Sequence, residues 1–161
     1  VGTLVAQKLV TLGAHVIAYR RSREALLREA ARIGIEPADG LEDLLSRSEL
    51  VTLHLPYTRE THLLIDERRL RMMRKGSYLV NTSRAWIVDG KALLRAIEEG
   101  VLEGAAVDVH YNEPPREEWE WKLIKHPRVI ATPHIGAQTR EAGFRISRML
   151  AGKLLEALMS S

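Results

Sequence analysis

The feature that most constrains the fold is a regular alternation of short apolar runs with segments of helical periodicity along the whole chain. Short apolar runs rich in Val, Ile, Leu and Ala are typical of buried strands. Parallel strands need a crossover connection, which is usually a helix, so this alternation predicts βαβ units. The sequence therefore predicts an α/β fold with an open, doubly wound parallel sheet. The expected strands are residues 15–19, 50–55, 78–81, 105–108 and 129–131.

The intervening segments favour helices, and no repeat or low-complexity linker divides the 161 residues. We therefore expect one domain over residues 1–161. A long helix is expected at about 139–159, because its apolar residues fall on one stripe. Residues 113–125 contain Pro114 and Pro115 and are expected to form a long irregular connection. The other expected helices begin at the chain start and at about residues 22, 41 and 91.

Charge and composition indicate which kinds of molecule the protein binds. The 24 Lys and Arg residues are scattered among 21 Asp and Glu residues, which disfavours nucleic-acid binding and favours small molecules. No apolar run approaches the roughly 20 residues of a membrane helix. The chain has no cysteine, so we expect no disulfide and a cytoplasmic setting. We also expect no metal site, because no His, Asp or Glu spacing has the tight form of a metal-binding motif.

Three polar side chains with complementary chemistry follow the ends of successive expected strands. They are Arg84, Glu113 and His134. Ligands bind at the carboxyl ends of strands in open α/β sheets, so we expect these side chains at one edge of the sheet. A guanidinium can hold a carboxylate through two parallel hydrogen bonds, and an imidazole can exchange a proton near neutral pH. The residues alone leave open a surface arginine, a structural histidine and a solvated glutamate.

Five sequence motifs occur in order along nearly the whole chain. They are His54-Leu55-Pro56 with Thr58 and Thr61, Lys75-Gly76, Asn81-Thr82-Ser83-Arg84 with Val88-Asp89, Asp108-Val109 with Glu113-Pro114, and Thr132-Pro133-His134-Ile135-Gly136-Ala137. Each is weak alone, but the set resembles the NAD-binding domain of the D-isomer-specific 2-hydroxyacid dehydrogenases. The resemblance implies a Rossmann-like dinucleotide-binding domain.

The resemblance also implies roles for individual residues. Arg84 would anchor the substrate carboxylate and His134 would be the acid/base, with Glu113 as the carboxylate that favours its protonated form. Asp108 would orient the nicotinamide carboxamide. The residues expected to bind the cofactor in this part of the chain are Gly2, Leu55, Pro56, Thr82, Ser83, Arg84, Asp108, His134 and Gly136.

The start of the chain departs from the family pattern. Members carry a first strand that ends in G-x-G-x-x-G, and Gly2 resembles only the third of these glycines. We therefore expect an N-terminally truncated dinucleotide-binding domain that lacks its first strand and has no substrate domain. Such a fragment is expected to be poorly folded and inactive by itself, because the loss of a central strand exposes hydrogen-bonding edges.

Cofactor choice is expected from the residues that follow strand 15–19. NAD-preferring folds place an acid there, but this chain has Arg20, Arg21 and Ser22, which resemble NADP-dependent members of the family. Two guanidiniums and a hydroxyl suit a 2′-phosphate, so we predict NADP(H) in preference to NAD(H). The alternative is a solvated basic run at the start of a helix.

The sequence thus predicts a NAD(P)-dependent D-2-hydroxyacid dehydrogenase that acts on a small 2-oxo or 2-hydroxy acid of the glyoxylate, hydroxypyruvate or phosphoglycerate type. The resemblance implies a homodimer. The alternatives are a dinucleotide-sensing protein similar to a corepressor and an inactive fragment. Two pairs depart from the family pattern, Ala85-Trp86 and His110-Tyr111, and their role in the pocket or a subunit contact is open.

Overall fold

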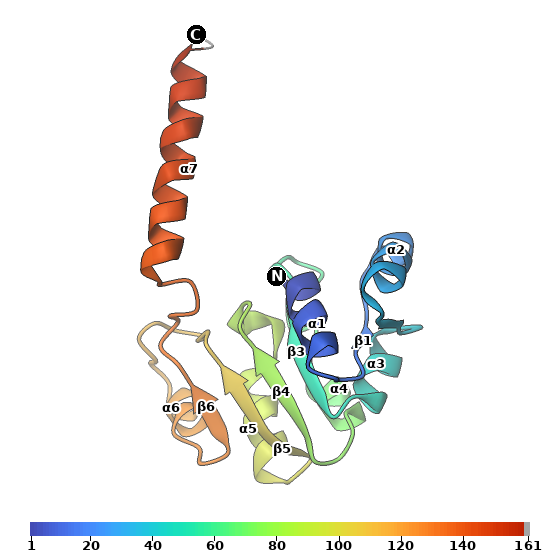
Figure 1. The fold of residues 1–161 in the computed structure, drawn as a ribbon. Helices are drawn as coiled ribbons and strands as arrows, with labels where there is room; N and C mark the ends of the chain where they lie inside the picture. Colours follow the sequence, from blue (N-terminus) through green and yellow to red (C-terminus); the bar gives the residue numbers. More distant parts are fainter. Residues whose placement is uncertain (160–161) are drawn as a thin grey trace.

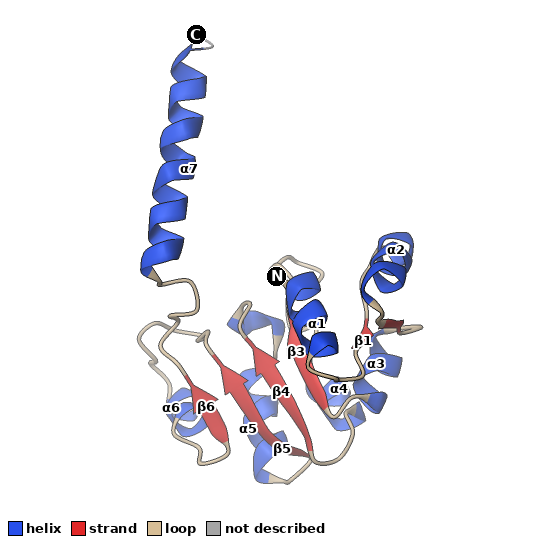
Figure 2. Ribbon diagram, in the orientation of Figure 1, coloured by secondary structure: helices blue, strands red, loops and turns tan. Residues whose placement is uncertain are grey.

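The computed structural model describes residues 1–159 and consists of parallel strands connected by helices (Figures 1 and 2). The helices are α1 (Gly2–Thr11), α2 (Arg23–Ile33), α3 (Leu41–Arg47), α4 (Glu67–Met72), η1 (Ala85–Ile87, a 3-10 helix), α5 (Gly90–Glu98), α6 (Glu118–Ile124) and α7 (Arg140–Met159). The strands are β1 (Ile17–Ala18), β2 (Glu36–Pro37), β3 (Leu50–Leu53), β4 (Ser77–Asn81), β5 (Leu102–Val107) and β6 (Val129–Ala131).

The main sheet has the order β3-β4-β5-β6, and all of its pairs are parallel. A separate parallel pair is formed by β1 and β2. All five predicted strands are therefore present, and the predicted α/β fold class is confirmed. The two sheets do not share a hydrogen-bonded pair of strands in the described part of the chain. Strand β1 is also shorter than predicted, since only two residues pair with β2.

The core lies between the main sheet and the row of helices α3 to α6. Leu79 of β4, Ile87 of η1 and Ile97 of α5 are fully buried in this layer. Helix α5 begins after Asp89, whose carboxylate accepts a hydrogen bond of 3.0 Å from the Ala92 amide, as expected for an N-cap. Helix α1 lies on the other side of the sheet (Figure 1). The arrangement leaves the carboxyl ends of all four strands at one edge.

Three elements differ from the sequence prediction. The irregular connection predicted at 113–125 is wrong in part, because helix α6 occupies Glu118–Ile124. The Glu120 side chain accepts a hydrogen bond of 2.8 Å from the Glu117 amide, which stabilises the first turn despite the nearby prolines. Helix α4 and strand β2 were not predicted. Both are short, and β2 contains a proline, so neither produces a clear periodicity.

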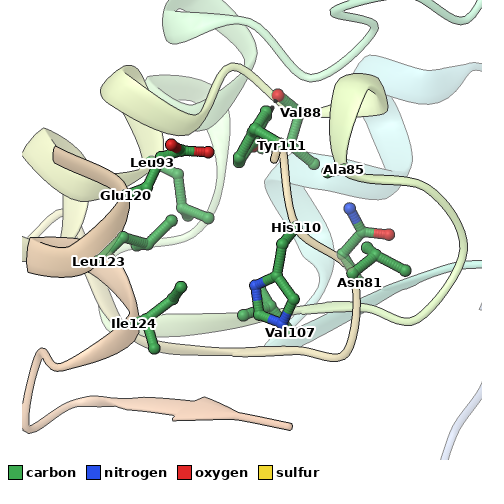
Figure 3. Close-up of a pocket in the computed structure, with 11 residues that line it drawn as sticks. Asn81, Ala85, Val88, Leu93, Val107, His110, Tyr111, Glu120, Leu123 and Ile124 are labelled. Carbon is green, nitrogen blue, oxygen red and sulfur yellow. Dashed lines mark hydrogen bonds between the residues drawn. The ribbon is translucent and has the colours of Figure 1, made fainter. Parts of the chain in front are cut away.

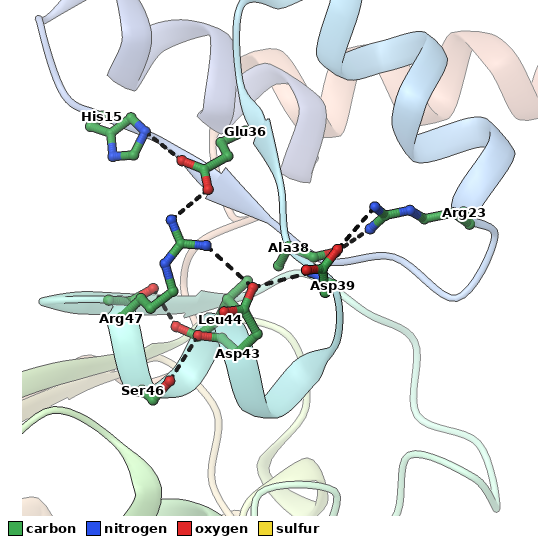
Figure 4. Close-up of polar contacts among 10 residues, drawn as sticks. His15, Arg23, Glu36, Ala38, Asp39, Asp43, Leu44, Ser46 and Arg47 are labelled. Atoms are coloured by element: carbon green, nitrogen blue, oxygen red, sulfur yellow. Dashed lines mark hydrogen bonds and ion pairs between the residues drawn. The ribbon is translucent and has the colours of Figure 1, made fainter.

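The small sheet is connected to α3 by ion pairs on the surface (Figure 4). Arg47 of α3 contacts Glu36 of β2 at 2.5 Å and Asp43 at 3.3 Å. Glu36 also contacts His15 at 2.9 Å. The hydrogen bond from Arg47 lowers the pKa of Glu36 below its usual value. These ion pairs join β2 to α3 on the surface, where such pairs contribute little to stability.

Helix α7 extends away from the rest of the domain (Figure 1). None of its residues is buried, and Phe144 is 71% exposed. The apolar residues of its stripe are therefore exposed. No helix within residues 1–159 is both long enough and apolar enough to cross a membrane.

The sheet provides a test of packing at Gly104 in β5. A Cβ atom at this position would lie inside van der Waals contact of the Arg128 backbone carbonyl oxygen. We expect Gly104→Ala to reduce the free energy of unfolding by about 1–3 kcal/mol, because the backbone before β6 must shift. Urea unfolding of the full-length protein measures this. Gly152→Ala in α7, where nothing lies within 4 Å, is the control and should not destabilise the protein. If Gly104→Ala and the wild type had the same free energy of unfolding, the close packing of Gly104 against the Arg128 carbonyl would be contradicted.

Candidate functional site

The predicted site residues lie in loops at the carboxyl edge of the main sheet. Arg84 follows β4, Asp108 follows β5 and His134 follows β6. These strands are neighbours and run in the same direction, so their following loops meet at one edge. The edge therefore combines a cation, a carboxylate and an imidazole from segments that are up to 50 residues apart in the sequence.

His134 and Glu113 form a direct pair. The distance between Nδ1 of His134 and Oε1 of Glu113 is 2.7 Å. The His134 side chain is 43% exposed and the Glu113 side chain is 49% exposed, so the pair is accessible to solvent. Because the carboxylate accepts at Nδ1, that nitrogen carries a hydrogen, and Nε2 is left to exchange a proton with a bound molecule. This is the geometry that an acid/base histidine requires.

The backbone at His134 adopts a left-handed conformation that is unusual for a residue with a side chain. Its φ angle is +54°. Asp108 holds the turn in this conformation, since its carboxylate accepts hydrogen bonds from the amides of Ile135 at 3.0 Å and Gly136 at 2.8 Å. A Cβ atom at Gly136 would approach Oδ2 of Asp108 to 2.8 Å, which leaves space only for glycine. Strained residues of this kind persist where surrounding contacts define the conformation, and they are common at functional sites.

Asp108 is 7% exposed, and its carboxylate accepts three hydrogen bonds from within the chain. The Thr132 hydroxyl also donates to it, at 2.5 Å. Burial would raise the pKa of Asp108, but the hydrogen bonds from Thr132, Ile135 and Gly136 outweigh burial and lower it. Asp108 is therefore ionised at neutral pH, and in this structure it fixes the turn that carries His134. The role at the nicotinamide carboxamide stays a prediction.

The loop that carries Arg84 is organised by Asn81, a residue that the sequence did not single out as functional. Asn81 is 2% exposed. Its Oδ1 accepts hydrogen bonds from the amide of Ser83 at 3.1 Å and from its hydroxyl at 3.0 Å, and its Nδ2 donates to the Arg84 carbonyl at 2.9 Å. An asparagine that is followed two residues later by a serine is the signal of such an Asx turn, and it could have been recognised.

The Arg84 guanidinium is on the surface of this loop. Its Nη1 donates to the Ser83 carbonyl at 2.6 Å, and no acidic side chain among residues 1–159 lies within 4 Å of it. Most of its donors are therefore free to bind an anion. Thr82, beside it, is exposed, while Ser83 is half-buried and oriented by Asn81.

Gly2, which is expected to bind the cofactor, lies at the start of α1. The first amides of this helix, as of any α-helix, have no intrahelical acceptor. A Cβ atom at Gly2 would lie 3.2 Å from Cβ of His54, which follows β3. The start of α1 therefore approaches the carboxyl end of β3 closely. Leu55 is half-buried against the core, and Pro56 is exposed beside it.

Arg20, Arg21 and Ser22 lie between β1 and α2 and are all exposed. Within residues 1–159 neither arginine forms an ion pair, whereas Arg23 is engaged by Ala38 and Asp39. Ser22 is the N-cap of α2, and its hydroxyl oxygen accepts a hydrogen bond of 3.4 Å from the Ala25 amide. The hydroxyl hydrogen and both guanidiniums therefore remain available to an anion.

The two departures from the family pattern take part in one aromatic cluster. Trp86 contacts Tyr111 edge to face at a ring distance of 5.3 Å, and Tyr111 contacts Trp119 at 4.9 Å. Trp86 is 46% exposed, so it is not a buried core residue. Tyr111 donates to the Val88 carbonyl, and burial raises the pKa of its hydroxyl. His110 lies 2.9 Å from the Thr132 carbonyl and supports the base of the His134 loop.

These features define the class of protein. A parallel α/β sheet, a helix that starts close to one strand end, and a histidine–carboxylate pair at the same edge are characteristic of a dinucleotide-binding domain of an oxidoreductase. Residues 1–136 match the family profile described as "D-isomer specific 2-hydroxyacid dehydrogenase, NAD binding domain". The chain belongs to this family, which confirms the resemblance deduced from the motifs.

Individual relatives agree with this assignment. The chain is 37% identical to a glyoxylate reductase of Thermococcus litoralis, over 96% of this chain and 45% of the relative. It is 35% identical to a D-3-phosphoglycerate dehydrogenase of Bacillus subtilis, over 97% of this chain and 29% of the relative. The crystal structure of a D-lactate dehydrogenase from Aquifex aeolicus, complexed with NAD and lactic acid, superposes with a TM-score of 0.84 at 33% identity. That comparison covers 99% of this chain and 50% of the other.

The chain thus spans less than half the length of the two relatives found by sequence.

Proposed function

We propose that the protein that carries this domain is a D-2-hydroxyacid dehydrogenase that interconverts a small 2-oxo acid and its D-2-hydroxy acid, of the glyoxylate, hydroxypyruvate or phosphoglycerate type, with NADP(H) as the preferred cofactor. The observation that supports it most strongly is the 2.7 Å pair of His134 and Glu113 at the sheet edge to which the Arg84 loop also belongs. The relatives named as reductases and dehydrogenases of such acids support the same reaction class.

The residues present are suited to a dinucleotide. The first amides of α1 can bind a pyrophosphate, because a helix start favours negative charge. The close approach of Gly2 to His54 leaves little space for a side chain where the phosphates would pass. Arg20, Arg21 and Ser22 offer unpaired donors at the end where the ribose would lie. When bound, a reduced nicotinamide supplies the hydride.

The chain's own residues would then hold the acid and deliver the proton. Arg84 binds the carboxylate of the 2-oxo acid through two parallel hydrogen bonds, which orients the ketone carbon. His134 donates its Nε2 proton to the ketone oxygen as the hydride adds to the carbon, so the carbonyl becomes a hydroxyl group. Glu113 holds the imidazole by Nδ1 and stabilises its protonated form before the transfer. In the reverse direction His134 accepts the proton.

A turnover assay tests the proposal. The full-length protein should oxidise NADPH in the presence of glyoxylate or hydroxypyruvate, followed by absorbance at the nicotinamide wavelength. A dinucleotide sensor would instead bind the nucleotide with negligible turnover. An absence of turnover with a panel of 2-oxo acids, while nucleotide binding is retained, would contradict the proposal and favour the sensor.

The NADP(H) preference is tested by Arg21→Ala. A charge-assisted hydrogen bond contributes about 1.5–3 kcal/mol, so we expect kcat/KM with NADPH to fall about 10- to 100-fold. The value with NADH should change much less, because NADH has no 2′-phosphate for the guanidinium to bind. Steady-state kinetics with both cofactors measures the ratio. A wild-type enzyme with the higher kcat/KM for NADH would contradict the preference.

The proposal also includes an oligomeric state and a location in the cell. The exposed apolar stripe of α7 supports contact with further protein, and we include a homodimer, which analytical ultracentrifugation of the full-length protein measures. We also include a cytoplasmic setting, supported by a sequence of 161 residues that contains no cysteine. Cell fractionation tests it.

A further inference from the structure

Glu120 is a buried carboxylate that takes no part in the proposed reaction. It lies in the first turn of α6 and is 2% exposed. Figure 3 shows it beside Leu93 and Tyr111 in the wall of a narrow pocket. A buried charge is costly unless hydrogen bonds compensate it, so a carboxylate retained here needs an explanation.

The hydrogen bonds of Glu120 all come from the segment that contains Glu113. Oε1 accepts from the amide of Asn112 at 3.0 Å. Oε2 accepts from the amides of Arg116 and Glu117, both at 2.8 Å. The side-chain amide of Asn112 adds contacts of 3.1 and 3.2 Å to the two oxygens. One carboxylate therefore binds the chain on both sides of Glu113.

The segment between these two anchor points is Glu113-Pro114-Pro115. Its two prolines have no amide hydrogen and restricted φ angles, so they cannot be held by backbone donors of their own. The Glu113 side chain is 49% exposed, and among residues 1–159 its hydrogen bond is to His134. Its position therefore depends on where the backbone places it, and Glu120 fixes that backbone.

The electrostatic surroundings keep Glu120 in its ionised form. Burial would raise its pKa, but the hydrogen bonds from Glu117, Arg116 and Asn112 outweigh burial and lower it. Of the neighbouring titratable groups, Tyr111 donates its hydroxyl to the Val88 carbonyl, and the Glu117 carboxylate contacts Lys91 at 3.4 Å. On the side of His134 the facing charged groups are Glu113 and Asp108.

We propose that Glu120 is a positioning residue for the dehydrogenase reaction, which holds the loop of residues 112–117 so that Glu113 meets the imidazole of His134. This inference rests on the proposed function for its kinetic consequences, but the geometric consequence is independent of it. The carboxylate acts through Glu113 and does not touch the substrate.

The kinetic test is Glu120→Gln in the full-length protein. Glutamine keeps the shape of the side chain but replaces one acceptor oxygen by a donor, so at least one backbone amide loses its partner. A small displacement of a reacting group costs up to about 100-fold in rate, and we expect kcat to fall about 10- to 100-fold. KM for the 2-oxo acid should not change, because Arg84 is untouched. The pH dependence of kcat should shift in the same direction in Glu120→Gln as it does in Glu113→Gln.

The double variant Glu113→Gln/Glu120→Gln shows whether the two residues act together. We expect it to be no slower than Glu113→Gln alone, since Glu120 then has nothing to position. The matched control is Glu118→Gln on the same helix, whose carboxylate is 83% exposed and pairs with Lys122, and it should match the wild type. Additive losses in the double variant would overturn the proposal.

A direct structural readout separates this inference from the proposed function. In crystal structures, the distance between Nδ1 of His134 and Oε1 of Glu113 should lengthen beyond hydrogen bonding in Glu120→Gln and stay near 2.7 Å in Glu118→Gln. An intact pair in Glu120→Gln would overturn the proposal even if the enzyme is active. If Glu120→Gln does not fold, Asn112→Ala removes only the side-chain contacts, and it should lower kcat several-fold at unchanged KM; an unchanged kcat would overturn the proposal.

Discussion

Replacement of His134 by glutamine is expected to lower kcat for the reduction of a 2-oxo acid by about 10²- to 10⁴-fold. Positioned general acid–base groups contribute rate factors of this size. Glutamine can still donate a hydrogen bond to Glu113, 2.7 Å from the imidazole in the structure, but it cannot transfer a proton at neutral pH. Binding of the nicotinamide cofactor should weaken much less than kcat falls, because most of the expected dinucleotide contacts lie on other loops. Steady-state kinetics and cofactor titration of the full-length protein measure both quantities.

His62→Gln is the control for this experiment. His62 is an exposed histidine whose Nδ1 lies 3.1 Å from the Tyr57 hydroxyl, so its partner is a neutral phenol and not a carboxylate. It should retain the wild-type kcat. If His134→Gln is as active as His62→Gln, the proton comes from another group, and the assignment of His134 as the acid is wrong.

Arg84→Lys should produce the second large effect. Lysine keeps the positive charge but not the planar fork, so one of two parallel hydrogen bonds to the substrate carboxylate is lost and the remaining geometry changes. We expect kcat/KM for the 2-oxo acid to fall about 100-fold, with the larger part in KM. The loop itself should persist, because Asn81 binds Ser83 and the Arg84 carbonyl rather than its side chain.

Arg74→Lys is the matched control. Arg74 lies before β4, at the opposite end of the strand from Arg84, and its guanidinium pairs with Glu49 at 2.8 Å. It should leave the kinetics unchanged. Comparable values for Arg84→Lys and the wild type would show that the arginine does not anchor the carboxylate.

The sequence predicted the helices and strands that have a strong periodicity and missed those whose periodicity is weak. Strand β4 and helix α5 have continuous apolar patterns and well-defined ends, so their positions were close to those observed. Helix α6 was missed as a helix because its start depends on Glu120, whose partners Asn112 and Arg116 lie in the preceding loop. Strand β2 was missed because two residues, one of them a proline, form it only through pairing with β1.

The sequence by itself determined the α/β class, the order of the strands along the chain, the family and the residue types placed after each strand. These follow from local periodicity and from motifs whose spacing is visible in one dimension. Only the tertiary structure decided that Glu113 lies 2.7 Å from His134, that Asp108 holds the His134 turn and that Glu120 holds the Glu113 loop. The physical reason is that these contacts depend on which strands become neighbours and on how burial and hydrogen bonding orient each loop. The spacing of the contacting residues along the sequence does not specify which strands are neighbours or how each loop is oriented.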